Sequence, residues 1–274
     1  MANDLLAIAC RALPLGHLPL LRYQARGRYA EYPGVRLAAY NLPGLGHNLA
    51  AVTGDAPPPD RVIALAAEFF AGGEGPWSIV VVADSAHPLE AALRARGWPV
   101  SQEHAAMVLP TIAVPANQVP QMTIRQVRDE RGLRDWFAAP FARAATSGGD
   151  PPLDDAGIDE AALLDDRYNR LLIPSLSVAL APDIALFTGY LDGQPVATAA
   201  LYCIAGVAEI GGVFTARPFR RRGIGAALIG AALAEGLARG CTAAALNASP
   251  AGAALYRRMG FQPACTLRAY AGAL

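Results

Sequence analysis

One segment constrains the fold of this chain more than any other. At residues 213–228 an apolar, strand-like run passes through a loop of arginine and glycine directly into a helix-forming run. The loop holds three consecutive arginines, at 220–222, and then Gly223 and Gly225. A helix N-terminus presents unpaired N–H groups and partial positive charge, and small residues let an anion approach that backbone closely. Guanidinium groups favour phosphate. The segment therefore predicts a strand–loop–helix unit that holds a pyrophosphate.

The composition narrows the choice of that ligand. All 23 basic residues are arginine, because the chain contains no lysine. This excludes a Walker-A phosphate loop and enzymes that need a Schiff-base lysine. A dinucleotide fold would place a third glycine where Leu228 stands, and would need a parallel strand where the pattern favours antiparallel ones. Nucleotide triphosphates are disfavoured by the missing lysine and by the lack of an obvious acidic metal cluster. Coenzyme A is the pyrophosphate that remains.

Charge, hydropathy and cysteine spacing exclude further classes. The formal net charge of the 274 residues is zero, which argues against a nucleic-acid partner. No apolar run is long enough for a membrane span, and Asp4 stands where a signal peptide has positive charge. The cysteines lack metal-ligand spacing, so we expect no metal and read them as buried thiols in a reducing, cytoplasmic compartment. These are Cys10, Cys203, Cys241 and Cys265.

Apolar periodicity predicts the secondary structure. Strands are expected over residues 122–127, 184–191, 196–203, 207–215 and 242–246, and helices over 62–70, 133–145, 225–239 and 251–259. Tight turns at residues 192–193 and 205–206 would join the three central strands into an antiparallel meander. Pro140 is expected to kink its helix.

Two stretches of the chain share one pattern of strand, Asp or Asn, Ser/Pro turn, short helix, glycine and aromatic residue. They are residues 79–98 and 242–261, and their offset is 163. The pattern indicates a structural duplication, although any strand–turn–helix–glycine unit takes this form. The offset pairs Asp84 with Asn247, Leu93 with Tyr256, and Gly97-Trp98 with Gly260-Phe261.

A proline-rich stretch near residues 110–122 suits an extended linker. We therefore predict domains at 1–110 and 122–274, joined by a linker at 111–121. The first domain has no counterpart of the arginine–glycine loop, and Leu93 stands where the second has Tyr256. It would be a degenerate, shorter copy that packs on the second domain and helps to shape its pocket.

The second domain resembles the GCN5-related N-acetyltransferase (GNAT) family. The family signature Arg/Gln-x-x-Gly-x-Gly/Ala is matched by residues 220–225, and the strand before it by residues 208–215. Asn247 and the Tyr-x-x-x-Gly-Phe run at 256–261 are similar to the family's closing motif. The resemblance covers about residues 122–274. One departure is Pro218, two residues before the signature arginine instead of three, which alters the loop shape but removes no donor.

The resemblance implies a mixed α/β fold: a mostly antiparallel sheet flanked by helices, here in tandem with the degenerate copy. It implies acetyl-CoA as co-substrate, with the thioester in a gap between the strands that bear Val213 and Leu246. Tyr256 would protonate the departing thiolate, and Asn247 would contact the coenzyme arm. The remaining coenzyme-binding residues would be Val213, Phe214 and Thr215 along the pantetheine arm and Arg220, Arg221, Arg222, Gly223, Ile224, Gly225 and Ala226 around the pyrophosphate.

The reaction would be direct attack of a primary amine on acetyl-CoA in a ternary complex. An alkyl amine is mostly protonated at pH 7, so a base must take its proton. Glu209 is the candidate, because it lies four residues before Val213 and so on the same strand face by period two. Simpler interpretations stay open. Glu209 would then be an exposed strand carboxylate, Tyr256 a packing partner of Phe261, and the arginines a solvated turn.

The acceptor is predicted to be a small-molecule amine or a peptide. Seven acids between residues 150 and 166 would form a rim that attracts a cation, or a solvated helix face. The four histidines show no metal spacing. The alternatives to an N-acetyltransferase are a non-catalytic acyl-CoA sensor or interaction module and a transferase of longer acyl groups. No nucleic acid or membrane partner is expected, and a homodimer is left open.

Overall fold

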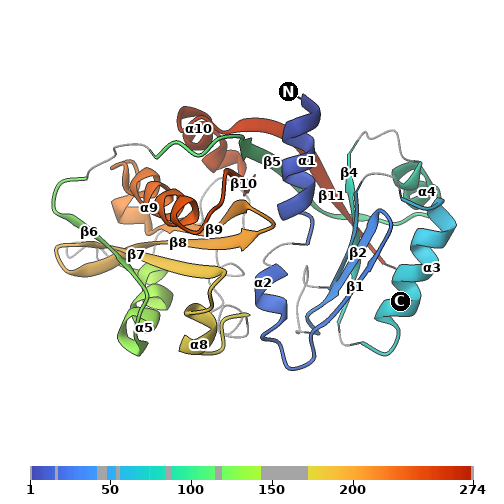
Figure 1. Cartoon of the computed structure of the whole chain (residues 1–274), viewed down its shortest axis with the longest axis horizontal. Coiled ribbons are helices and arrows are strands. Elements are labelled where there is room, and N and C mark those ends of the chain that lie inside the picture. The colour runs from blue at the N-terminus through green and yellow to red at the C-terminus, as the bar shows by residue number, and fades with distance from the viewer. Residues whose placement is uncertain are drawn as a thin grey trace. The chain divides into compact units, whose positions relative to one another are not determined.

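The computed structural model describes residues 2–15, 18–41, 48–53, 56–73, 75–83, 88–114, 119–142 and 172–272. These residues form two compact units, coloured along the chain in Figure 1. The first unit comprises residues 1–108, 245–249 and 262–274, and the second comprises 109–244 and 250–261. The first unit thus contains the end of the chain, which the sequence analysis had placed in the C-terminal domain.

The first unit is a mixed sheet covered by helices. Its strands lie in the order β1-β2-β3-β4-β11-β5, with only β3 and β4 parallel among the pairs whose register is described. Val62, Leu65 and Phe70 of the predicted helix pack in its core. The elements are α1 (Ala2–Ala12), α2 (Leu18–Leu21), β1 (Arg28–Tyr32), β2 (Val35–Ala39), β3 (Asn48–Val52), α3 (Pro59–Phe70), β4 (Ser78–Val82), α4 (Leu89–Ala95), β5 (Val100–Leu109), β10 (Ala243–Ala248) and β11 (Gln262–Ala271).

The two stretches related by 163 residues fold alike. The first forms β4, α4 and then β5. The second forms β10, α10 (Pro250–Arg258) and then β11. Both helices end in the same way: Trp98 N donates to Leu93 O at 3.1 Å, and Phe261 N donates to Tyr256 O at 3.0 Å. Since the glycine before each aromatic residue has positive φ, both ends have the form of a left-handed C-terminal cap.

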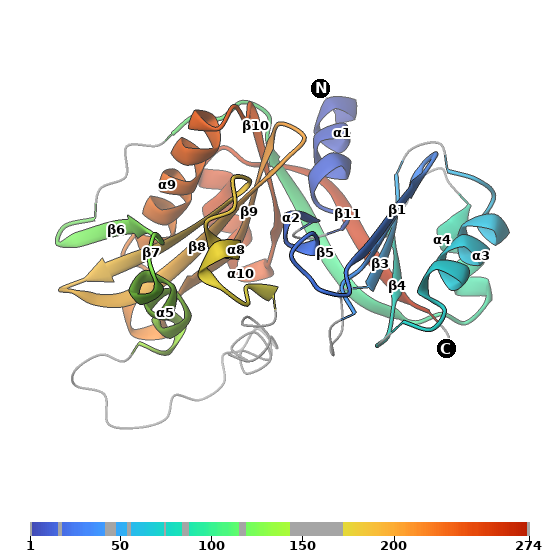
Figure 2. The same ribbon diagram turned by 60° about the horizontal axis from the view of Figure 1, so that its bottom comes forward.

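The final strand of the chain lies between two strands from its beginning. β11 pairs antiparallel with β4 on one side and with β5 on the other, as Figures 1 and 2 both show. In the second pair Leu267 lies opposite His104, and these two residues are themselves 163 apart. The equivalent strands β5 and β11 therefore pair about a local pseudo-twofold axis. This pairing supports the predicted duplication.

The second unit is an antiparallel meander with helices on both faces. Its sheet order is β9-β8-β7-β6. A Cβ at Gly236 of α9 would meet Ala208, whereas a Cβ at Gly212 would meet Trp136 of α5, so α9 and α5 cover opposite faces. The elements are β6 (Met122–Gln126), α5 (Glu130–Ala138), η1 (Ala139–Phe141), α8 (Leu176–Ala179), β7 (Ile184–Leu191), β8 (Gln194–Ile204), β9 (Val207–Thr215), η2 (Arg217–Phe219), α9 (Ile224–Ala238) and α10.

Local sequence signals set most of these boundaries. The predicted tight turn is present: Asp192 and Gly193 both have positive φ, as in a type I′ hairpin turn. The predicted helix over 133–145 is wrong at both ends. It begins at Glu130, because Asp129 caps it by accepting from Gly132 N at 2.7 Å. It gives way to η1 at Ala139, since Pro140 has no N–H for the helical ladder.

A charged network holds β11 in the first unit. Oε1 of Glu90 accepts from Arg268 Nη1 at 2.7 Å, from Tyr270 Oη at 2.8 Å and from Arg94 Nη2 at 2.8 Å. Arg268 Nε also donates to Glu103 of β5 at 2.5 Å. Charge-assisted bonds at largely shielded side chains are stronger than surface ion pairs, so this network stabilises the position of the final strand.

We expect Glu90→Ala to lower the free energy of unfolding by about 1–3 kcal/mol, because Arg268 and Tyr270 lose their shared acceptor. The matched control is Asp60→Ala, which removes an exposed partner of Arg96 and should cost less than about 1 kcal/mol. Urea unfolding measures both, and equal losses would show that the network adds nothing beyond an ordinary surface pair.

Candidate functional site

The loop between β9 and α9 has the form that its sequence predicts. β9 ends at Thr215, η2 follows, and α9 begins at Ile224 with Gly223 as its N-cap. Gly223 has no side chain to cap this end of α9, and among the described residues no side chain accepts from the N–H groups of its first turn. Gly223 is exposed and Gly225 is partly exposed. An anion can therefore reach an uncapped helix N-terminus here.

Gly223 is required by the backbone. Its φ of +79° lies in the left-handed region, where a side chain adds strain. Arg221 also has positive φ, at +67°. Gly225 has a different role. A Cβ there would lie 3.5 Å from Leu255 Cδ2, an ordinary contact, so the protein itself would tolerate alanine. The position faces Leu255 of α10 and Thr215 of β9.

Two of the three arginines support the loop rather than standing free. Arg220 Nε donates to Thr215 O at 2.9 Å, and its guanidinium lies 5.5 Å from the ring centroid of Phe214. Arg222 Nη2 donates to Pro218 O at 3.3 Å. Both side chains fix the turn through its carbonyl groups and add positive charge beside it. Arg220 is partly buried by these contacts, whereas Arg222 is exposed, so the interpretation as a solvated basic turn stays open for Arg222.

A bulge in β9 changes which residues share a face. Glu209 pairs with Tyr202 and Gly211 with Ala200, but Thr198 pairs with Phe214, so β9 holds one extra residue near Gly212. Gly212 has positive φ. Because paired residues share a face, Glu209 shares one with Phe214 and not with Val213. The period-two argument that placed Glu209 and Val213 together is therefore wrong.

Glu209 is a buried carboxylate on the face of the sheet that α5 covers. Its side chain is 3% exposed, so the interpretation as an exposed strand residue is wrong. Tyr202, directly opposite on β8, is also 3% exposed. Burial and the charge of Glu209 raise the pKa of Tyr202 well above its usual value, so this phenol stays neutral. A carboxylate placed next to a neutral phenol can accept a proton.

Tyr256 lies on α10, beside the start of α9. Its neighbour Leu255 packs near Gly225, and the Tyr256 ring makes an edge contact with Phe261 at 6.0 Å. The ring also lies over Gly252, where a Cβ would come within 2.7 Å of Cε2. Burial raises the pKa of Tyr256, whose side chain is 8% exposed. The residue is thus both a packing partner of Phe261 and a protonated phenol, on a helix that meets the start of α9 through Leu255.

The structure places the other predicted residues as follows. Val213, Phe214 and Thr215 are partly exposed at the end of β9, and Asn247 is exposed on β10. Asn247 and Leu246 belong to the first unit and Val213 to the second, so the expected gap between their strands stays a prediction. The acids between residues 150 and 166 lie outside the described residues, as do His17, His47 and His87.

The described residues show no group that could hold a metal ion. All four cysteines are free, but only Cys241 is buried, so the prediction of four buried thiols is wrong for the other three. The described helices include none long and apolar enough to cross a membrane.

The loop of the first unit that corresponds to the anion loop cannot serve the same purpose. It lies between β3 and α3, where Pro58 is the N-cap and Pro59 begins the helix, and Pro57 precedes them. Proline has no N–H, so these three positions offer no backbone donor to an anion. The prediction that the first domain lacks a phosphate site thus has a physical reason.

The fold matches solved structures along nearly the whole chain. A GCN5-related N-acetyltransferase from Kribbella flavida is 22% identical, with a TM-score of 0.66, and the match covers 96% of this chain and 95% of that one. One from Sphaerobacter thermophilus is 17% identical, with a TM-score of 0.55 and coverage of 99% and 93%. A tandem GNAT protein from the clavulanic acid biosynthesis pathway is 15% identical, with a TM-score of 0.51 and coverage of 87% and 78%. At these identities the likeness shows the fold.

These matches define the class: a mixed α/β protein of the GNAT fold, as predicted, built as a tandem. Residues 150–261 match the sequence profile of the Acetyltransferase (GNAT) family. A search of curated proteins gave no match.

Proposed function

We propose that this protein transfers the acetyl group of acetyl-CoA to a primary amine of a small molecule or peptide. The observation that carries the proposal is the uncapped N-terminus of α9, entered through the left-handed Gly223. Its backbone N–H groups, with the positive charge of the loop arginines, suit the diphosphate of coenzyme A. The match of residues 150–261 to an acetyltransferase family supports the same ligand.

In this proposal β9 holds the pantetheine arm by main-chain pairing at Val213, Phe214 and Thr215. The arm would add a strand to the exposed end of β9. The diphosphate would contact the backbone from Arg221 to Ala226, and Asn247 would contact the arm. These assignments follow the family resemblance residue by residue.

Glu209 is the proposed general base. The neutral amine nitrogen attacks the thioester carbonyl carbon, a C–N bond forms, and the nitrogen gives one proton to the carboxylate, directly or through water. The C–S bond then breaks and the electron pair leaves on sulfur. Because Glu209 lies on the face that α5 covers, the acceptor is expected to approach from that face.

Tyr256 is the proposed general acid that protonates the departing thiolate. Burial keeps its phenol protonated at neutral pH, and Leu255 places α10 against the start of α9. The phenol is therefore available as a proton donor on the side of the unit where the coenzyme is proposed to bind.

Two other functions remain to be separated by experiment. A non-catalytic acyl-CoA sensor would bind the coenzyme without turnover, and a transferase of longer acyl groups would prefer a longer thioester. The decisive measurement is release of free thiol from acetyl-CoA in the presence of a library of amines, with propionyl- and butyryl-CoA in parallel. If calorimetry shows coenzyme binding but no amine causes release of thiol, the protein is a non-catalytic acyl-CoA sensor.

We expect Gly223→Ala to weaken coenzyme A binding, because a side chain at φ +79° strains the turn that presents the N–H groups. Gly240→Ala is the matched control. It sits at φ +84° beyond the other end of α9 and meets nothing within 4 Å. Both variants should lose about 1–2 kcal/mol of stability, but only the first should lose affinity by calorimetry. If the two variants bind coenzyme A with equal affinity, the loop is not part of the binding site.

We expect Glu209→Gln to lower kcat by about 10²-fold or more, because the amide cannot take the amine proton. Coenzyme affinity should not change. Glu235→Gln is the control, since it alters a carboxylate on α9 that pairs only with Arg239 four residues away. Steady-state kinetics measures the effect, and wild-type turnover in Glu209→Gln would contradict the role.

We expect Tyr256→Phe to lower kcat by about 10²-fold, since the ring keeps its packing on Phe261 but loses the donated proton. Burial raises the pKa of Tyr256, so its protonated form persists to higher pH than that of a free phenol. Any loss of rate at alkaline pH that is due to this group should therefore occur above pH 10. A kcat that is unchanged in Tyr256→Phe, with an unchanged pH profile, would assign the residue to packing alone.

A further inference from the structure

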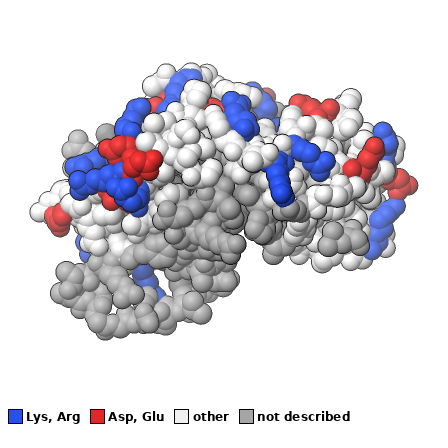
Figure 3. Space-filling view, turned by 90° about the horizontal axis from the view of Figure 1, so that it is seen from below, with Lys and Arg blue, Asp and Glu red and all other residues white. Residues whose placement is uncertain are grey.

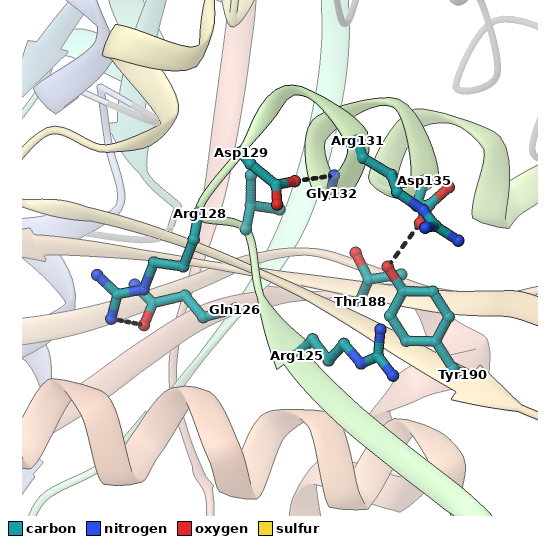
Figure 4. Close-up of a pocket in the computed structure, with 10 residues that line it drawn as sticks. Arg125, Gln126, Arg128, Asp129, Arg131, Gly132, Asp135, Thr188 and Tyr190 are labelled. Atoms are coloured by element: carbon teal, nitrogen blue, oxygen red, sulfur yellow. Dashed lines mark hydrogen bonds between the residues drawn. The ribbon is translucent and has the colours of Figure 1, made fainter. Parts of the chain in front are cut away.

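A polar cavity in the second unit lies apart from the α9 loop and shares none of its residues. It has a volume of about 200 Å³ and lies between β6, the start of α5, and β7. Arginine, aspartate, threonine and tyrosine side chains line it, as Figure 4 shows. The acetyl-transfer chemistry proposed above does not use any of these groups. A cavity of this size fits a small polar ligand or one charged group of a larger one.

Thr188 supplies the most informative group of this cavity. The residue is 1% exposed, and within the described part of the chain its Oγ1 makes no hydrogen bond at 3.5 Å or less, although it lies close enough to the Tyr190 phenol to lower the pKa of that group. In Figure 4 the hydroxyl points from β7 into the space below α5, beside the Tyr190 phenol. A buried hydroxyl without a partner costs free energy that an apolar residue of the same shape would not. A ligand that accepts a hydrogen bond from Thr188 removes this cost.

Two arginines approach the same space from different elements. The guanidinium of Arg125 on β6 lies 5.0 Å from the ring centroid of Tyr190, and Arg131 extends from α5. Neither forms an ion pair with a carboxylate of the described residues at 4 Å or less. Arg128 is directed away, toward Gln126 Oε1 at 2.5 Å.

The two carboxylates of the cavity already have donors. Asp135 accepts from Tyr190 Oη at 2.9 Å, and Asp129 accepts from Gly132 N at 2.7 Å. Burial and the bond to Asp135 raise the pKa of Tyr190 to about 12, so the phenol adds no negative charge. The surface around α5, at the left of Figure 3, likewise carries positive and negative side chains together. With Arg128 directed away, Arg125 and Arg131 face the cavity together with Asp129 and Asp135, and both aspartates already accept hydrogen bonds.

We propose that this cavity is a second ligand site, which binds one oxyanion group through the Thr188 hydroxyl and the guanidinium groups of Arg125 and Arg131. Both a carboxylate and a phosphate have the required chemistry: oxygen acceptors for a hydroxyl donor and negative charge for two cations. With a volume of about 200 Å³, the cavity has room for the oxyanion group but not for the rest of a large ligand. The proposal does not depend on acetyl transfer.

The test is a titration of the full chain with inorganic phosphate and, separately, with acetate, followed by amide chemical shifts in two-dimensional NMR. We expect saturable shifts at the amides of residues 125–132 and 187–190 with at least one of the two anions. The response to each anion identifies the preferred group. Shifts at residues 221–226 report the α9 loop in the same spectra, so failure at one site is distinguishable from failure at the other. No saturable shift around the cavity with either anion would overturn the proposal.

Three variants separate a ligand site from a structural one. Thr188→Val should weaken anion affinity by about fivefold, while its unfolding temperature stays the same or rises, because an unbonded hydroxyl is removed. Arg125→Gln should weaken affinity as well. Arg134→Gln, on α5 but outside the lining, is the control and should bind as the wild type does. Equal weakening in Arg134→Gln, or unchanged affinity in Thr188→Val, would contradict the proposed site.

Discussion

The backbone hydrogen bonds of β11 are the interaction on which the rest of this structure depends. This strand follows directly from the helix that bears Tyr256, yet it pairs with β4 and β5 from the first hundred or so residues. The charged network around Glu90 adds to the same placement. A fragment that begins at residue 122 would therefore leave β11 without its partner strands and expose unpaired N–H and C=O groups. The final strand of the chain thus depends on the first unit for its pairing.

The bulge at Gly212 decides which residues of β9 share a face of the sheet. Because β9 contains one extra residue, the residues after the bulge lie on the opposite face from the one that strict alternation would give. Glu209 therefore lies on the face that α5 covers, and Val213 lies on the other face. A Cβ at Gly212 would lie 3.4 Å from the Trp136 ring, so the bulge packs closely against α5.

Local features were predictable from the sequence, and long-range ones were not. The central hairpins follow from Asp192-Gly193 and similar turns, and the α9 start follows from Gly223 in its setting, because these depend on neighbouring residues. The phase of β9 depends on the register with β8, and the arginine contacts depend on the shape of the finished turn. The cavity at Thr188 joins side chains from β6, α5 and β7, which no spacing in the sequence brings together. The sequence alone does not show whether a polar strand residue such as Thr188 is buried or exposed, because that depends on the elements that pack against it.

The equivalent loops of the two copies differ mainly in whether their backbone offers N–H donors. Both units pass from a strand through a loop into a helix and then to the next strand, and both closing helices end with the same cap. In the second unit the helix opens with a left-handed glycine and bare N–H groups. In the first, consecutive prolines stiffen the same turn and remove its donors. The prolines also reduce the entropy lost on folding. The first copy therefore keeps the strand–loop–helix frame but lacks the backbone N–H donors that the second copy presents at the same turn.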